Sequence, residues 1–172
     1  MSTQVTRTSI VWDYAPAPES TDHLRLRESY GLFIDGAFTE GSDGRTFKTV
    51  NPATEEVLAE VTEATEADVD LAVDAARRAF AGWSRMPGRE RAKYLYRIAR
   101  IIQERARELA VLESLDNGKP IRESRDVDIP LVSQWFFYYA GWADKLSYAG
   151  LGANPRPLGV AAQVIPWNFP LL

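Results

Sequence analysis

The sequence ends on Val164-Ile165-Pro166-Trp167-Asn168-Phe169-Pro170-Leu171-Leu172, an apolar run that leads into a corner bracketed by two prolines. Pro166 and Pro170 fix their own φ angles and push the residue before each of them toward extended geometry. Asn168 therefore lies on a stiffened segment, which can aim its side chain. Its amide offers two N–H donors that do not change with pH and that suit an oxygen gaining negative charge in a reaction. The alternative is a proline-bracketed turn whose Asn bonds to nearby backbone.

The apolar run before this corner predicts a buried strand. Residues 158–165 are almost continuously apolar and lie between prolines, which is typical of a strand covered on both faces of a parallel sheet. Parallel strands need crossover neighbours, and no later residues supply them. We therefore expect an incomplete sheet, and a chain that exposes apolar surface and is unstable or sticky alone. From this pattern we expect that the domain is not complete within these residues.

Composition excludes several classes of protein. The chain is 45% hydrophobic and 26% charged, which is ordinary globular usage for one domain of this length. Its net charge is −4, with acids and bases mixed, so we expect neither nucleic acid nor membrane as a partner. The N-terminal residues lack a signal-peptide core, which makes the cytoplasm the expected compartment. With no Cys and the single His23, neither a disulfide framework nor a metal site is expected.

The remaining patterns predict strands followed by helices. Residues 1–28 read as an extended arm. Strands are expected over 30–38 with a hairpin turn at Asp35-Gly36, and over 46–50 and 57–61. Three helical segments follow: one capped by Thr65 and ending at Gly82-Trp83, one long helix over 89–116 stopped by Asn117-Gly118, and one over 121–146 that kinks or restarts near Asp128 because of Pro130.

Lys119 allows two interpretations. It lies between Gly118 and Pro120, where a Lys beside backbone N–H groups could hold a phosphate. A helix stop with a cation at the negative end of the helix dipole is the interpretation that the pattern favours.

Five motifs carry a resemblance to a known family. Pro157-Leu158-Gly159-Val160 followed by residues 164–170 resembles the segment by which NAD(P)-dependent aldehyde dehydrogenases are recognised. In the family's order, upstream residues support it: Phe33-Ile34-Asp35-Gly36, Asn51-Pro52-Ala53-Thr54-Glu55-Glu56-Val57, Asn117-Gly118-Lys119-Pro120 and Tyr139-Ala140-Gly141-Trp142-Ala143-Asp144-Lys145. The resemblance covers about residues 30–172, which is most of the chain.

The resemblance implies an α/β fold: the N-terminal part of a Rossmann-like, three-layer αβα nucleotide-binding domain, over 29–172, with an incomplete sheet. It implies NAD(P)-dependent oxidation of a small-molecule aldehyde to a carboxylic acid through a cysteine thiohemiacetal. Asn168 would be catalytic, as donor to the oxyanion, and Val164, Ile165, Pro166 and Trp167 would line the site of NAD or NADP. Because the chain has no Cys, the nucleophile would lie outside it, and the chain alone would be inactive.

Residues 147–156 depart from the family pattern. Relatives spend more residues here, on a β-hairpin used in subunit pairing, whereas this segment is short and loop-like. The resemblance implies a homo-oligomer in the full-length form, and the departure indicates that this subunit contact differs. A second function class stays open: a non-catalytic interaction module that docks on a full-length dehydrogenase through its exposed strand.

Overall fold

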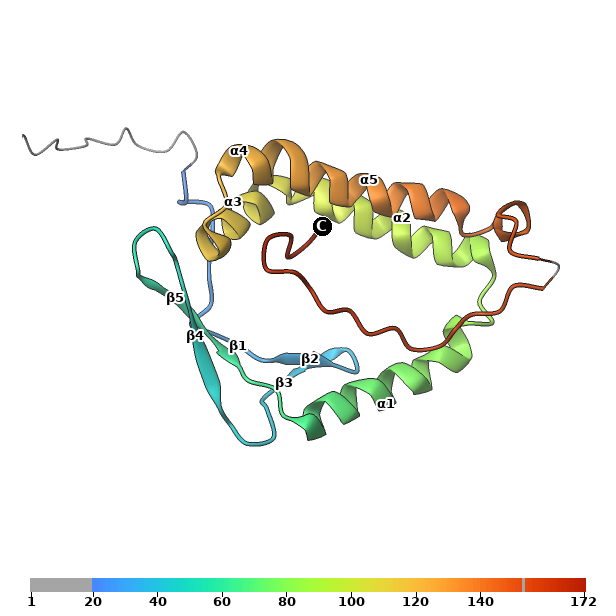
Figure 1. Ribbon diagram of the computed structural model, residues 1–172, viewed down its shortest axis with the longest axis horizontal. Helices are drawn as coiled ribbons and strands as arrows, with labels where there is room; N and C mark the ends of the chain where they lie inside the picture. The colour runs from blue at the N-terminus through green and yellow to red at the C-terminus, as the bar shows by residue number, and fades with distance from the viewer. Residues whose placement is uncertain (1–19, 153) are drawn as a thin grey trace, which may run out of the picture.

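The computed structural model describes residues 20–152 and 154–172. In Figure 1, a small sheet lies at one end, a pair of long helices runs along one side, and a single helix lies opposite them. Most of the expected arm over 1–28, including Trp12 and Tyr14, lies outside the described residues. The domain boundary at residue 29 therefore stays a prediction.

The strands form a three-stranded sheet and a separate hairpin. Their bounds are β1 Ser29–Tyr30, β2 Leu32–Ile34, β3 Ala37–Thr39, β4 Thr46–Val50 and β5 Val57–Thr62. The sheet order is β1-β5-β4, in which β1 is parallel and β4 antiparallel to β5, and β2 pairs with β3. The predicted hairpin turn is confirmed, because Asp35 and Gly36 have φ angles of 53° and 82°, as a type I′ turn requires.

The single strand expected over 30–38 is interrupted at Gly31. A Cβ at this position would lie 2.5 Å from the Thr39 carbonyl oxygen. The backbone of β3 thus passes so close to the β1–β2 junction that only glycine fits there.

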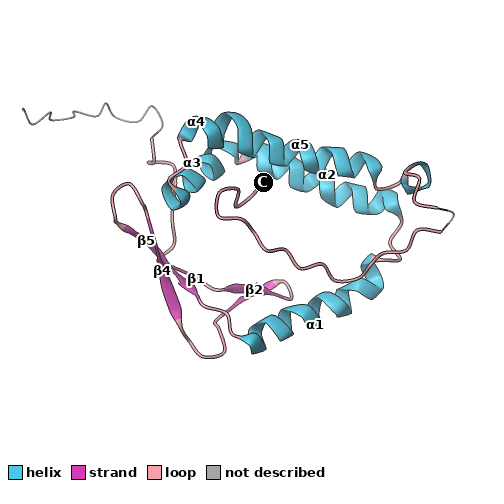
Figure 2. Ribbon diagram, in the orientation of Figure 1, coloured by secondary structure: helices cyan, strands magenta, loops and turns pink. Residues whose placement is uncertain are grey.

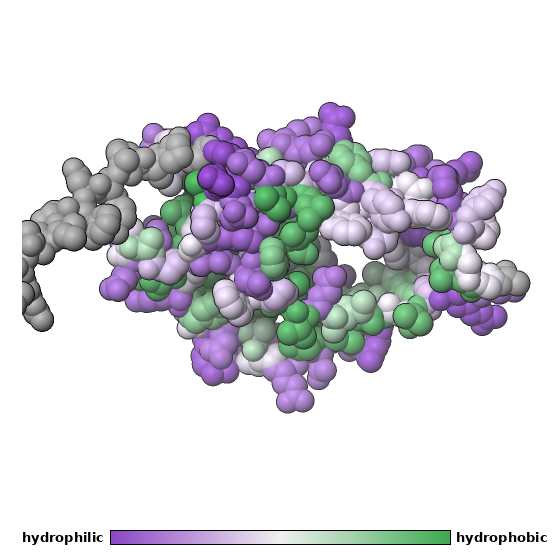
Figure 3. All heavy atoms as spheres, turned by 45° about the horizontal axis from the view of Figure 1, so that its top comes forward, coloured by the Kyte–Doolittle hydropathy of each residue, from purple (hydrophilic) through white to green (hydrophobic). Residues whose placement is uncertain are grey.

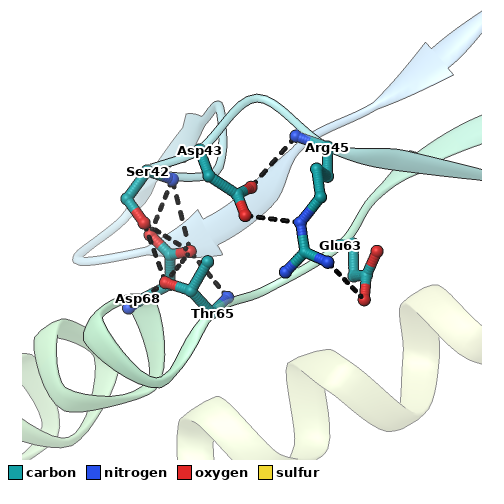
Figure 4. Close-up of polar contacts among 6 residues, drawn as sticks. All are labelled: Ser42, Asp43, Arg45, Glu63, Thr65 and Asp68. Carbon is teal, nitrogen blue, oxygen red and sulfur yellow. Dashed lines mark hydrogen bonds and ion pairs between the residues drawn. The ribbon is translucent and has the colours of Figure 1, made fainter.

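Helix α1, Glu66–Trp83, begins and ends as predicted. Thr65 caps it, and the Asp68 carboxylate accepts in return from the Thr65 backbone N–H at 2.8 Å, which is a complete capping box. Asp68 also accepts from the Ser42 backbone N–H at 3.1 Å, so the cap ties the β3–β4 loop to the helix (Figure 4). Beside it, Arg45 pairs with Asp43 and with Glu63.

The long helix expected over 89–116 is two helices, α2 Gly88–Glu104 and α3 Ala106–Asn117. Arg105 lies between them with a non-helical φ of −105° and ψ of 16°. No Gly or Pro marks this break. Since α2 packs along α5 whereas α3 packs against the turn before α5, we attribute the change of direction to tertiary contacts that the local pattern does not contain.

The third helical stretch is interrupted before Pro130, as predicted. It consists of α4 Ile121–Glu123, the π-helical turn η1 Ser124–Asp128 and α5 Ile129–Trp142, followed by a 3₁₀ turn, η2 Leu146–Tyr148. Pro130 stands at the start of α5. Because proline has no backbone N–H, it cannot donate to a carbonyl of the preceding turn, and the α-helical hydrogen-bond pattern is interrupted there. The core lies between α2, α3 and α5 and centres on Ile102, Ala110, Ile129 and Val132.

The strand predicted over 158–165 is absent, which corrects that prediction. These residues are extended but pair with no strand among the described residues, and Val164 is 98% exposed (Figure 2). A parallel strand forms only beside a neighbour, and none lies here. Residues 149–172, apart from the undescribed residue 153, run back between α1 and the α2–α5 pair (Figure 1).

Exposed apolar surface was predicted and is confirmed. Large hydrophobic side chains of several elements are exposed, among them Trp135, Tyr138 and Tyr139 on α5 and Leu158 and Val164 in the C-terminal segment. Figure 3 shows hydrophobic residues gathered around a hollow in the middle of one face. Among the described helices, none is both long and apolar enough to cross a bilayer.

Candidate active site

The proline-bracketed corner is a β-turn. The Phe169 N–H donates to the Pro166 carbonyl at 3.2 Å, which places Trp167 and Asn168 at the two central positions. The Asn168 side chain is exposed, and its amide has no hydrogen-bond partner among the described residues. The turn expected from the alternative interpretation is thus present, but the Asn168 amide is not consumed by nearby backbone.

The other four predicted site residues form one continuous exposed stretch that leads into this turn. Val164, Ile165, Pro166 and Trp167 are all exposed, and Trp167 is 83% exposed. The structure therefore brings all five predicted residues together, because they are consecutive.

The C-terminal end of α3 holds the turn in place. Gly118 has a φ of 79° and ends α3 in the left-handed conformation, with its N–H donating to the Ser114 carbonyl. On one side of it, the Asn117 side chain donates to the Trp167 carbonyl. On the other side, the Lys119 ammonium donates to the Asn168 carbonyl at 3.2 Å and lies 3.9 Å from the centre of the Phe169 ring.

Lys119 is also part of a buried ionic cluster. Its ammonium donates to the Asp128 carboxylate and lies 4.0 Å from the Glu113 carboxylate. The side chains of Lys119, Glu113 and Asp128 are 15%, 5% and 2% exposed. Burial and then the neighbouring Asp128 carboxyl raise the pKa of Glu113 to about 7, against the opposing effect of Lys119. Neither Glu113 carboxyl oxygen accepts a hydrogen bond from a described residue.

The π-helical turn places Asp128 in this cluster. The Ile129 N–H donates to the Ser124 carbonyl, five residues back, so the turn is wider than an α-helical one. The Ser124 hydroxyl is buried and lies 3.3 Å from that of Ser114 on α3. Such turns are frequent at functional sites because they re-aim a side chain.

Sequence reasoning missed this support for the turn. The favoured interpretation of Lys119 was a cation near the helix end, and the helix stop at Gly118 is present. Lys119 is nevertheless a mostly buried cation that holds a segment 49 residues further along the chain. The available signal was that Asn117-Gly118-Lys119-Pro120 and residues 164–170 are both motifs of the family resemblance, but neither motif by itself indicates that the two segments touch.

The site thus contains the free Asn168 amide on a turn whose carbonyls bond to Asn117 and Lys119, next to exposed apolar side chains. Free N–H donors of fixed orientation stabilise negative charge that develops on an oxygen. The exposed apolar stretch over 164–167 has side chains available to pack against a planar ring, so the residues present are compatible with a dinucleotide. Among residues 20–152 and 154–172, no group of His, Cys, Asp or Glu has the arrangement of a metal site.

Helices with a partial sheet make this a mixed α/β protein, and solved structures place it in the Rossmann-like class. An NAD⁺ complex of aldehyde dehydrogenase from Bacillus cereus superposes on 70% of this chain and 25% of its own, with a TM-score of 0.68 and 49% identity. An indole-3-acetaldehyde dehydrogenase in its apo form superposes on 88% of this chain and 36% of its own, with a TM-score of 0.77 and 35% identity.

The family model described as "Aldehyde dehydrogenase family" matches residues 38–172. The chain belongs to the aldehyde dehydrogenase family. The mitochondrial aldehyde dehydrogenase family 2 member B4 of Arabidopsis thaliana is 44% identical over 151 residues, which are 82% of this chain and 28% of that protein. The chain spans about a third of the length of the curated relatives that it matches. The predicted family and fold class are thus confirmed.

Proposed function

We propose that these residues form part of an enzyme that oxidises a small-molecule aldehyde to a carboxylic acid with NAD or NADP. The observation that carries the proposal is the Asn168 amide, which is free on a turn whose backbone is held by α3. Addition of a nucleophile to an aldehyde carbon moves negative charge onto the aldehyde oxygen. Two N–H donors aimed at that oxygen would stabilise the charge as it develops.

The nucleophile in this proposal lies outside the 172 residues. A cysteine is the nucleophile that the family resemblance implies, and this chain contains none. We therefore expect no turnover from the 172-residue chain by itself.

The dinucleotide, when bound, would accept a hydride from the aldehyde carbon. This chain's part would be to border it with Val164, Ile165, Pro166 and Trp167, whose exposed side chains can cover ring faces and keep water away. NAD is the cofactor to test first, since the aldehyde dehydrogenase from Bacillus cereus was solved as an NAD⁺ complex.

A chimera tests the proposal. Residues 30–172 replace the corresponding segment of the Bacillus cereus enzyme, which is 49% identical over the 70% of this chain that superposes. We expect aldehyde-dependent NADH formation by the chimera and none by the 172-residue chain. Asn168→Ala should lower kcat by about 10²–10³, as loss of an oxyanion donor does. Asn154→Ala is the matched control, because Asn154 is exposed on a loop outside the turn. An unchanged kcat in Asn168→Ala would remove Asn168 from the mechanism.

We further propose a cytoplasmic, homo-oligomeric protein that binds neither nucleic acid nor membranes. The mixed charges and the net charge of −4 support the absence of those two partners, and the family resemblance supports the homo-oligomer. Sedimentation of the chimera at several concentrations tests the oligomer, and imaging of the tagged native protein tests the compartment.

The extended residues 158–165 favour a second candidate function. Their backbone groups pair with no strand among the described residues, so they could add to the sheet edge of a full-length dehydrogenase. In this case the 172-residue chain would co-elute with the Bacillus cereus enzyme on size exclusion, whereas separate elution would exclude that docking.

A further inference from the structure

Two side chains flanking Gly118 hold two successive carbonyls of the turn. Asn117 donates to the Trp167 carbonyl, and Lys119 donates to the Asn168 carbonyl. These carbonyls belong to the peptide planes on either side of the Asn168 Cα. Fixing both planes fixes the φ and ψ of Asn168, and so the direction of its Cα–Cβ bond.

Few other hydrogen bonds restrain the turn. Trp167 is 83% exposed, and among the described residues the turn has one backbone hydrogen bond of its own, from the Phe169 N–H to the Pro166 carbonyl. Phe169 is 39% exposed and contacts Lys119, whose ammonium lies 3.9 Å from the ring centre, and the following Pro170 and Leu171 lie beside α3. The hydrogen bonds that orient the Asn168 backbone therefore come largely from residues 117 and 119.

Lys119 is itself held rigidly. Its ammonium has three N–H donors, one of which goes to Asp128 and another to Asn168, while its positive charge faces the Phe169 ring. Because its side chain is only 15% exposed, water competes weakly for these donors. This mostly buried ammonium, with two of its donors in use, links Asp128 of the π-helical turn to the carbonyl of Asn168.

We propose that Asn117 and Lys119 are positioning residues that orient the Asn168 amide. Asp128 holds Lys119 in place by accepting a hydrogen bond from its ammonium. The effect of these residues on catalysis rests on the proposed function, whereas their hydrogen bonds to the turn are observed independently of it. Either the effect on catalysis or the effect on the turn can be wrong without the other, so each is measured separately.

The first measurement is the mobility of the turn in the 172-residue chain. Backbone ¹⁵N order parameters are about 0.85 for rigid segments and below about 0.6 for flexible ones. We expect those of Trp167, Asn168 and Phe169 to fall from the rigid to the flexible range in Asn117→Leu, and in the variant that carries both Lys119→Met and Asp128→Asn. The double change is used because Lys119→Met alone leaves buried carboxyls without their cation and could unfold the chain.

Lys145→Met is the matched control for these variants. Lys145 also follows a helix end, pairs with Asp144 and donates to the Gly141 carbonyl at 2.8 Å, but it does not contact the turn. Its loss should leave the order parameters of residues 167–169 unchanged. Rigid values in both Asn117→Leu and the double variant would overturn the inference, whether or not the protein oxidises aldehydes.

The second measurement is kinetic, in the Bacillus cereus chimera. Misplacing a catalytic group by about 1 Å can cost about 10²-fold, so we expect each variant to lower kcat by about 10- to 100-fold. KM should change by less than about 3-fold, because the affected interaction forms in the transition state.

Combination with Asn168→Ala separates positioning from general damage. If residues 117 and 119 act through Asn168, adding either variant to Asn168→Ala costs nothing further. If the fold-decreases in kcat of the single variants multiply in the combined variants, the positioning role is overturned. An inactive chimera with a turn that loosens as expected would instead overturn the proposed function and leave the holding of the turn intact.

Discussion

Replacing Glu113 by Gln should make this chain more stable at pH 8 and leave its stability at pH 5 nearly unchanged. The Glu113 carboxyl is 5% exposed, accepts no hydrogen bond from a described residue, and lies beside Asp128. Gln has the shape of the protonated acid but does not titrate. The substitution therefore isolates the cost of ionising one buried carboxyl.

The magnitude follows from the pKa of Glu113, which is raised from 4.5 to about 7. Between these two values the folded state holds a proton that the unfolded state has released, so the free energy of unfolding falls as pH rises through this window. A pKa difference of one unit corresponds to about 1.36 kcal/mol, which gives about 3 kcal/mol above pH 7. This pKa already includes the opposing charge of Lys119, which lies 4.0 Å away, so we expect a difference of about 3 kcal/mol at pH 8.

Urea unfolding followed by circular dichroism at pH 5, 6, 7 and 8 measures this difference. Glu104→Gln is the matched control, because Glu104 is an exposed glutamate on neighbouring α2, and its pH profile should follow the wild type. A Glu113→Gln variant that is less stable than the wild type at pH 8, or that differs from it equally at every pH, would refute the reasoning.

Three further predictions concern the elements that carry the site. Thr65→Ala removes the α1 cap and should lower the free energy of unfolding by about 1 kcal/mol, as urea unfolding would show. The backbone N–H of Thr65 lowers the pKa of Asp68, so the contribution of Asp68 to the free energy of unfolding is present above the ordinary pKa of Asp and is lost as pH falls. In Asp68→Asn the free energy of unfolding should therefore fall less steeply on acidification, as urea unfolding over a range of acidic pH would show. Gly88→Ala would place a Cβ 2.2 Å from the Ala143 carbonyl oxygen and should destabilise by about 1–3 kcal/mol, whereas Gly82→Ala, with open space around it, should not.

Features set by local chemistry were predictable from the sequence. The Asp35-Gly36 turn and the Thr65 cap depend on residues within four positions of each other, and both formed as expected. The end of α3 at Gly118 was also predictable, because a glycine in the left-handed conformation terminates a helix through local hydrogen bonds. The family followed from motifs that are themselves short and local.

Features set by distant contacts were not predictable. The break at Arg105 has no Gly or Pro, and it follows from the different packing partners of α2 and α3. The apolar run over 158–165 has the composition of a buried strand, but a strand needs a neighbour that composition cannot supply. The stiff turn around Asn168 was anticipated from its prolines, whereas its support by residues 117 and 119 spans about fifty residues of sequence.

The buried cluster beneath the turn is better explained by orientation than by stability. Removing a lysine and two carboxyls from water costs several kcal/mol per ion, and replacing a buried ion pair by well-packed hydrophobic residues of similar volume is often neutral or stabilising by about 1–4 kcal/mol. Glu113, which the variant keeps, is neutral below its pKa of about 7, so the comparison is made at pH 6. We therefore expect the variant with Lys119→Met and Asp128→Asn to unfold at an equal or higher urea concentration than the wild type, while residues 167–169 become mobile. If the cluster served stability instead, the same variant would have a lower free energy of unfolding than the wild type and would keep residues 167–169 ordered. The midpoint of urea unfolding and the order parameters of residues 167–169 therefore distinguish a role in orientation from a role in stability. The contacts of Lys119 with Asn168 and Phe169 favour the role in orientation.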